Sequence, residues 1–290
     1  MIESSPLTPP LAPNHATPAR PSRPARALRP RLARDLALIG ALAHRDLLRL
    51  MKDPGRWLGL VLQPLLLWAL MGSGMGQVFS VPGLPEVDYH RFFFPGLLVM
   101  VALFTAIFAT MAVIEDRDHG FLQQVLVAPA SRTAMVLGKV TGVTLIALVQ
   151  LALVLPAAPL AGFHFGDIAF LPVIAGYTLG VIGMTSLAFA LAWVSRTTAG
   201  YHAVMGVLLI PLWLVSGSVF PLPHDGALSV VGRIDPITYA VDALRHGLDG
   251  GHSALATTGP GLTFALLGAF AVLALVLASF VARRNPGCPA

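Results

Sequence analysis

The sequence predicts an all-α integral membrane protein with six transmembrane helices, an N-terminal amphipathic interface helix and a short external re-entrant helix. Three observations support this fold class. Hydrophobic residues make up 56% of the chain and charged residues only 11%, against about 25% charged in an average soluble domain. Several apolar stretches are long enough to cross about 30 Å of hydrocarbon. The positive charges lie almost entirely on one side of the predicted membrane.

The chain divides into three parts. Residues 1–34 are rich in Pro, Ala and Arg without apolar periodicity, which predicts a disordered, basic cytoplasmic tail. We expect this tail to contact anionic lipid headgroups rather than nucleic acid. Residues 35–284 form the six-span transmembrane domain, and residues 285–290 a short cytoplasmic tail. The one cysteine, Cys288, cannot form an internal disulfide, so the fold does not depend on an oxidising compartment.

Residues 35–52 have the pattern of an amphipathic helix. Apolar residues recur at steps of three and four: Leu36, Ile39, Ala43, Leu47 and Leu50. Charged residues fall largely on the other side: Asp35, Arg45, Asp46, Arg49 and Lys52. The sequence Asp53-Pro54-Gly55 ends the helix. Because a membrane span follows at once, we expect this helix to lie along the membrane interface.

Six apolar stretches are candidate spans. They cover residues 57–78, 92–114, 136–163, 168–194, 198–222 and 260–282. Apart from Lys139, near the mouth of the third, none contains Asp, Glu, Lys or Arg. A charge at the centre of a span costs about 2.5–3.5 kcal/mol, so this absence is what a lipid-solvated bundle requires. The external segment 223–259 has a helical stretch near 236–248, whose apolar face predicts a short helix dipping into the outer leaflet. That face comprises Ile237, Ala240, Val241 and Leu244.

The distribution of lysine and arginine sets the orientation. With the N-terminus in the cytoplasm, the cytoplasmic segments hold all but three of the 19 lysines and arginines. The external exceptions are Arg91, Arg233 and Arg245. We therefore expect a multi-pass protein of the plasma (inner) membrane with both termini in the cytoplasm.

No motif for catalysis, cofactor binding or metal binding is present in the sequence. Gly138-Lys139 lacks the upstream glycine of a P-loop and is followed by Val140. The spans hold no carboxylate, which argues against transport driven by a proton or sodium gradient. Small-residue spacings occur at Gly138/Gly142 and at Gly176/Gly180, and packing within one chain is favoured over a dimer contact.

The cytoplasmic segment 115–133 is the most informative. Phe121, Leu122, Val125 and Leu126 form an apolar face of a short helix, which Pro129 ends. A short helix of this kind at the cytoplasmic surface can dock a partner protein, or it can lie on lipid. The residue pattern alone leaves these two interpretations equally open.

Several segments resemble the ABC-2 type permease family, which comprises membrane subunits of ATP-binding cassette exporters. The first resemblance runs from Phe94-Pro95-Gly96 through Glu115, Arg117, Gly120, Pro129, Ser131-Arg132 and Gly138-Lys139. The second lies in the outer loop, in Asp235-Pro236-Ile237-Thr238-Tyr239 followed by Asp242, Arg245 and Gly250. The resemblance covers nearly all of residues 35–284. Its nearest branch contains drug-resistance and lipooligosaccharide export permeases, and this branch does not fix the substrate.

This resemblance implies a permease subunit that forms a substrate path and is driven by a separate cassette ATPase. The chain itself is then not an enzyme and needs no cofactor. The implied partners are a cassette ATPase, a second copy of the chain in a homodimer and membrane lipids, without nucleic acid. The alternative is a self-contained membrane transporter, or a membrane scaffold, that works without an ATPase.

Two groups of residues are the candidates for these roles. The resemblance and the loop pattern together place coupling to the ATPase on Glu115, Arg117, Gly120, Phe121, Leu122, Val125 and Leu126. We expect Glu115 and Arg117 to form an ionic latch between the loop helix and the interface helix. The resemblance implies that the second and fifth spans line the substrate path, with Phe104, Thr105, Phe108, His202, Leu209, Trp213 and Ser216 as candidate lining residues.

Overall fold

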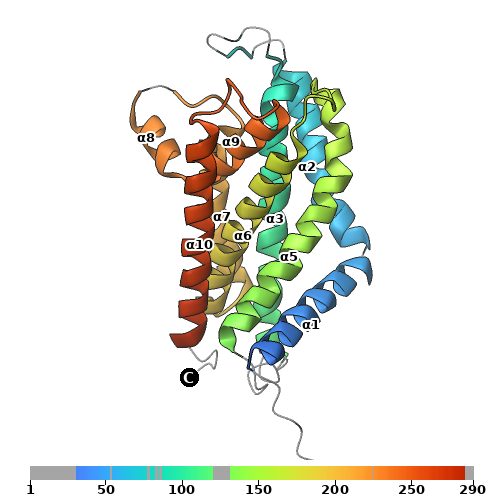
Figure 1. The fold of residues 1–290 in the computed structure, drawn as a ribbon, viewed down its shortest axis with the longest axis vertical. Helices are drawn as coiled ribbons and strands as arrows, with labels where there is room; N and C mark the ends of the chain where they lie inside the picture. The colour runs from blue at the N-terminus through green and yellow to red at the C-terminus, as the bar shows by residue number, and fades with distance from the viewer. Residues whose placement is uncertain are drawn as a thin grey trace, which may run out of the picture.

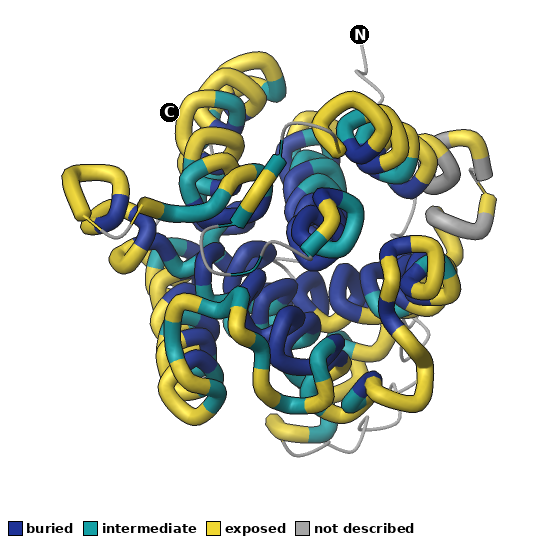
Figure 2. The backbone as a smooth tube through the Cα atoms, turned by 90° about the horizontal axis from the view of Figure 1, so that it is seen from above, coloured by how far each residue is buried: buried dark blue, intermediate teal, exposed yellow. Residues whose placement is uncertain are grey.

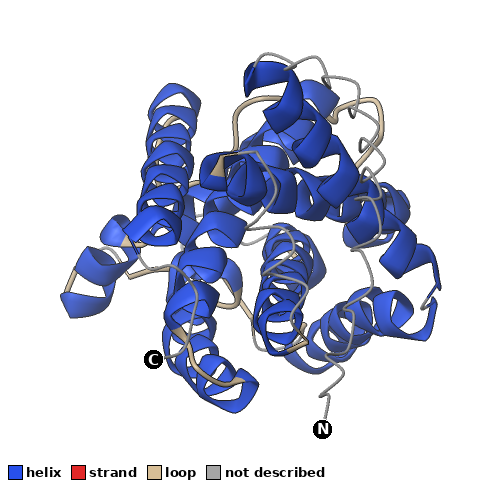
Figure 3. Ribbon diagram, turned by 90° about the horizontal axis from the view of Figure 1, so that it is seen from below, coloured by secondary structure: helices blue, strands red, loops and turns tan. Residues whose placement is uncertain are grey.

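The computed structural model describes residues 31–52, 54–76, 79–81, 84, 87–119, 131–223 and 225–284. These residues form helices joined by short connections (Figure 3). The α-helices are α1 (Arg31–Lys52), α2 (Pro54–Met75), α3 (Tyr89–Asp118), α5 (Arg132–Val154), α6 (Phe170–Val194), α7 (Thr198–Trp213), α8 (Ala227–Ile234), α9 (Pro236–Leu248) and α10 (Pro260–Arg284). A 3-10 helix, η1 (Leu155–Ala161), continues α5, and a π-helical turn, η2 (Leu214–Ser218), continues α7.

The long helices stand side by side in one bundle (Figure 1). Helices α3 and α6 are buried along most of their length and form its centre, as the dark core in Figure 2 shows. Helix α10 packs against α6, and α1 packs against α5. The start of α1 and the end of α10 lie at the lower end in Figure 1, whereas α8 and α9 lie at the upper end.

Five helical segments of the described chain are long and apolar enough to cross a membrane. They are Tyr89–Asp118, Arg132–Ala161, Phe170–Val194, Thr198–Ser218 and Pro260–Arg284, which correspond to the second through sixth predicted spans. The first predicted span is helical, as α2, but its described apolar part, Gly59–Met75, is shorter than a full span. The all-helical fold is therefore confirmed, while the six-span count remains a prediction.

The helix predicted over residues 35–52 is present as α1, but it faces the bundle differently from the pattern in the sequence. Helix α1 buries Ala43 together with Asp46, and Leu36 at 59% exposure points away from the bundle. The expectation that Asp46 lies on a polar outer face is therefore wrong. The reason lies in tertiary packing, because a charged partner on α5 offsets the cost of burying the Asp46 carboxylate.

Both small-residue spacings serve packing within the chain, as expected. A Cβ added at Gly138 would lie 3.1 Å from a side-chain atom of Leu42, and one at Gly142 would lie 3.1 Å from the Cα of Ala43. These glycines let α1 approach the backbone of α5 closely. Gly176 and Gly180 do the same for α9, where the alanine side chains at positions 243 and 240 fill the space.

The external helix near 236–248 is present as α9, and its predicted apolar face is buried. Its polar side is also buried, including Asp242, Arg245 and His246. The helix lies against α6, α10 and the π-helical turn η2. Within this turn Gly217 adopts φ 77°, a left-handed conformation that favours glycine.

Candidate functional site

A buried ion pair joins α1 to α5. The Lys139 ammonium donates to Asp46 Oδ2 over 2.8 Å, and both side chains are less than a tenth exposed. The glycines at 138 and 142 bring the two backbones close enough for this contact. Pairing removes the large penalty of an isolated charge in an apolar bundle. Lys139 is the one residue among Asp, Glu, Lys and Arg within the predicted spans, and its pairing with Asp46 accounts for its place there.

A second set of ion pairs joins α1 to the end of α3. Asp116 accepts from Arg45 Nη2 over 2.6 Å and from Arg49 Nη2 over 3.2 Å. Arg45 also lies 3.5 Å from Asp46. The two acids and their basic partners form one network, which we call the α1 clamp: Arg45, Asp46, Arg49, Asp116 and Lys139.

The expected latch residues point elsewhere. Arg117 donates to the backbone carbonyls of Trp193 and Ser195 at the end of α6, with the first contact 3.3 Å long. Glu115 forms no ion pair with any residue that the structure describes. The prediction that Glu115 and Arg117 form an ionic latch to the helix at 35–52 is therefore wrong. Asp116 is the residue of α3 that forms ion pairs with α1.

The start of α5 is also tied to α1. Ser131 donates to the two carboxylate oxygens of Asp35, through its backbone N–H over 2.8 Å and its hydroxyl over 2.9 Å. The backbone N–H and then the hydroxyl of Ser131 hold the pKa of the exposed Asp35 carboxyl below its usual range. Ser131 in turn caps α5 by accepting from Ala134 N–H. Helix α1 therefore holds the helices that flank residues 120–130 on both sides.

Five of the predicted coupling residues lie outside the described part of the chain. They are Gly120, Phe121, Leu122, Val125 and Leu126. Their assignment to coupling stays a prediction.

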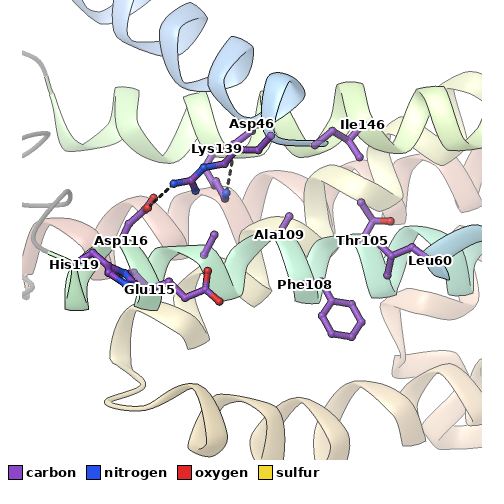
Figure 4. A pocket seen from close by; sticks show the side chains of 12 residues that line it. Asp46, Leu60, Thr105, Phe108, Ala109, Glu115, Asp116, His119, Lys139 and Ile146 are labelled. Carbon is purple, nitrogen blue, oxygen red and sulfur yellow. Dashed lines mark hydrogen bonds and ion pairs between the residues drawn. The ribbon is translucent and has the colours of Figure 1, made fainter. Parts of the chain in front are cut away.

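A pocket of about 350 Å³ lies beside the α1 clamp (Figure 4). Its polar lining comes from Asp46, Arg49, Thr105, Glu115, Asp116, His119 and Lys139. Its apolar lining comes from Leu60, Phe108, Ala109, Ala112 and Ile146. The charged groups lie towards one end and the apolar groups towards the other, which is the layout of a site for an amphipathic molecule.

The predicted path residues fall into separate environments. Thr105 and Phe108 line the pocket. Phe108 also belongs to an aromatic row, with ring centroids 6.4 Å from Phe104 and 5.8 Å from His202. The exposed His202 lies 3.0 Å from the sulfur of Met111, so it contacts α3 across the gap between helices, as expected for an interhelical polar contact.

The other predicted path residues are enclosed by protein. Leu209, Trp213 and Ser216 are buried, and Trp213 Nε1 donates to Gly96 O over 3.1 Å. Ser216 Oγ donates to Trp213 O over 2.6 Å. These three residues hold the end of α7 against α3. They thereby help to position the aromatic row of Phe104, Phe108 and His202, which lies between the same two helices.

A polar network at the opposite end of the bundle fixes α9. Arg245 donates from Nη2 to Gly217 O over 2.7 Å and from Nη1 to Leu255 O over 2.9 Å. Its guanidinium also lies 4.8 Å from the centre of the Phe92 ring and 3.4 Å from Asp242. The same arginine therefore holds α9, the break at the end of α7 and the start of α3 together.

Sequence reasoning missed Asp46 and Asp116 as site residues. A signal for the first was present, since a lysine in an apolar helix requires a nearby acid. No comparable signal indicates which of the three charged residues at 115–117 faces α1.

Long apolar helices in one bundle, with a charged network at one end, define a multi-pass helical membrane protein. Residues 37–248, more than half of the chain, match the ABC-2 type transporter family. The chain belongs to this family and is a permease subunit of such a transporter.

Relatives with curated descriptions agree with this family. A protein of Cyanophora paradoxa named as transport permease ycf38 is 28% identical over 208 residues, which cover 70% of this chain and 71% of the relative. The protein named as ycf38 in Porphyra purpurea is 25% identical over 72% of each chain. YbhR of Escherichia coli K12, named as a multidrug ABC transporter permease, is 27% identical over 56% of this chain and 44% of its own length.

Proposed function

We propose that this permease forms the substrate path of an exporter and is driven by a separate cassette ATPase bound beneath it. The observation that carries this proposal is the α1 clamp. Movement of an ATPase must be transmitted to the spans mechanically, which requires a stiff element at the cytoplasmic surface. Helix α1 contacts the end of α3 through Asp116 and the start of α5 through Asp35 and Asp46. A force applied at residues 120–130 would therefore reach both spans.

In this proposal α2 completes six spans, and both termini lie in the cytoplasm. Helix α1 lies at the inner interface, and α9 dips into the outer leaflet. The start of α1 and the end of α10 lie at the same end of the bundle, which supports this arrangement. The positive residues of that end include Arg31, Arg34, Arg283 and Arg284. This charge bias favours a cytoplasmic position for that end, and the plasma membrane is the location that we propose.

Cysteine labelling tests the orientation. In a Cys288→Ala background, Asp88→Cys and Leu228→Cys are expected to react with an impermeant thiol reagent applied to intact cells, because both positions belong to external segments. Gln124→Cys is expected to react only after the membrane is opened, which also controls for its reactivity. Labelling of position 124 in intact cells would reverse the proposed topology.

A second copy of the chain is the proposed partner in the membrane. Helix α7 is buried along one ridge only, at Tyr201, Met205, Leu209 and Trp213. The rest of the helix is exposed or half-buried, with Val207 at 79% exposure. The aromatic row of Phe104, Phe108 and His202 runs beside this exposed surface. Two copies that faced each other here would enclose a largely apolar path, with the remaining apolar surface left to lipid.

Substitution in the loop tests coupling to the ATPase. If Leu122 inserts into a groove of the ATPase, Leu122→Asp places an unpaired charge at that interface. Truncating a strong interface anchor costs about 2 kcal/mol or more, over tenfold in affinity, and a buried charge should cost at least as much. We expect Leu122→Asp to leave the permease inserted but to release the ATPase from membranes and abolish transport, as measured by membrane fractionation of the ATPase and by a transport assay.

Gln123→Asp is the matched control, since it adds the same charge on the polar side of the same segment. It should have a mild effect. Retention of the ATPase and full transport by Leu122→Asp would exclude this loop as the coupling element and favour α1 instead. A purified complex without any ATPase would support the alternative of a self-contained transporter or scaffold.

A further inference from the structure

The pocket beside the α1 clamp is lined by three acidic side chains, and the clamp pairs two of them. Among the acids of its lining, Asp46 is paired with Lys139, and Asp116 is paired with Arg49. Arg45, which lies outside the lining, is shared between the same two acids. Glu115 forms no side-chain hydrogen bond or ion pair with any described residue. Glu115 is therefore the one acid of the pocket lining that the α1 clamp does not pair, and its charge offsets the third base of the clamp.

Glu115 lies on the same face of α3 as Phe108, whose aromatic ring lines the pocket. Phe108, Ala112, Glu115 and His119 follow one another at steps of four, three and four, so they share one face of the helix. Figure 4 shows the Phe108 ring and the Glu115 carboxylate on the same side of α3, with Ala112 as a small residue between them in sequence. A molecule in the pocket can meet the ring and the carboxylate together.

The apolar end of the pocket is well suited to hydrocarbon. Its lining there comes from three helices, with Leu60 of α2, Phe108 and Ala109 of α3, and Ile146 of α5. Phe108 continues outward through the aromatic row to Phe104 and His202. Phe108 therefore belongs both to the pocket lining and to the aromatic row proposed above as part of the substrate path.

We infer that this pocket binds a hydrophobic organic cation, with Glu115 as its counter-charge and Phe108 as the ring that the cation contacts. An aromatic face and a carboxylate both attract a cation, and an apolar wall rewards the removal of its hydrocarbon from water. An anion in the pocket would lie near the Glu115 carboxylate and be repelled by it. The bases of the lining are already paired, Arg49 with Asp116 and Lys139 with Asp46. This inference rests on the proposed export function. In that function the pocket is the site at which the permease first binds its substrate on the cytoplasmic side.

Binding to the purified permease tests the inference without an ATPase. The probe is radiolabelled methyltriphenylphosphonium, and the competitors of nearly the same shape are neutral triphenylphosphine oxide and anionic triphenylacetate. We expect saturable binding of the cation, weaker competition by the neutral compound and the weakest by the anion. Glu115→Gln is expected to weaken cation binding by about tenfold and to leave the affinity for triphenylphosphine oxide unchanged, since about 1.4 kcal/mol corresponds to a factor of ten.

Two further variants separate the charge from the fold. Phe108→Leu keeps the pocket apolar but removes the ring, and should weaken binding of the cation more than that of the neutral compound. Asp118→Asn removes an exposed acid three residues beyond Glu115 that does not line the pocket, and should leave binding unchanged. Equal affinity of the wild-type and Glu115→Gln proteins for the cation, or stronger binding of the anion, would overturn the inference.

The result is independent of the ATPase experiment. Cation binding that depends on Glu115, in a permease that recruits no ATPase, would retain the pocket and reject the proposed coupling. Recruitment of the ATPase without Glu115-dependent binding would do the reverse.

Discussion

Asp46→Ala is expected to lower the free energy of unfolding by about 3–5 kcal/mol, the range for removing one partner of a buried ion pair. The substitution leaves the buried Lys139 ammonium without its acid, because the 2.8 Å contact to Asp46 is lost. Only a small part of the loss comes from packing, because alanine retains the Cβ that lies against Gly142. Denaturant titration of the purified protein in detergent, followed by tryptophan fluorescence, measures the change.

The double variant Asp46→Leu with Lys139→Met is the informative control. It replaces the pair by apolar groups of similar length, which is often neutral or stabilising for a buried pair. The double variant should therefore be more stable than Asp46→Ala. If the single variant unfolds at the wild-type denaturant concentration, the Lys139 charge is solvated and α1 is not anchored by this pair.

Arg245→Leu is expected to release α9 from the bundle. The guanidinium is buried and donates to Gly217 O, Leu255 O and Asp242. Its removal takes this donor from the two carbonyls and leaves the Asp242 carboxylate, which still accepts from Thr257, without its basic partner. At about 3 kcal/mol or more for a broken buried pair, local opening should become over a hundredfold more frequent. Hydrogen exchange of the backbone amides in residues 236–258 measures this opening.

Arg245→Lys and Arg233→Leu complete the comparison. Lysine retains the charge but cannot reach several acceptors at once with a planar fork, so an intermediate exchange rate is expected. Arg233 is exposed on α8, and its substitution should leave exchange in α9 unchanged. Wild-type exchange in Arg245→Leu would mean that apolar contacts alone hold the external helix.

The order and limits of most helices follow from the sequence because apolar runs and helix-ending residues are local signals. The second, third, fourth and sixth spans appear as α3, α5 with η1, α6 and α10, close to their predicted limits. The fifth departs from a regular helix, since α7 gives way to a π-helical turn at Leu214. Local residues contribute, since Pro211 lies inside α7 and Gly217 adopts a positive φ. A non-local contact adds to them, because Arg245 of α9 donates to the Gly217 carbonyl. Helix α8 was not predicted, because it is only one exposed amphipathic segment of eight residues.

The site was less predictable because it depends on the rotation of one helix. Successive residues of an α-helix point about 100° apart. Glu115, Asp116 and Arg117 therefore serve three different neighbours: the pocket, α1 and the end of α6. The sequence pattern indicated that this charged turn is functionally important. Which of its residues contacts α1, and which contacts α6, depends on how α3 packs in the bundle. The same holds for Asp46, whose burial depends on Lys139 at a separation of 93 residues.

The 93-residue separation also has a consequence for biosynthesis. Helix α1 leaves the ribosome well before α5, so the Asp46 carboxylate has no Lys139 to neutralise it while α2 and α3 enter the membrane. An acid without its cation stays in water or among headgroups. Seating of α1 in the groove at Gly138 and Gly142 is thus a late step of maturation, which takes place only after the third predicted span has been inserted.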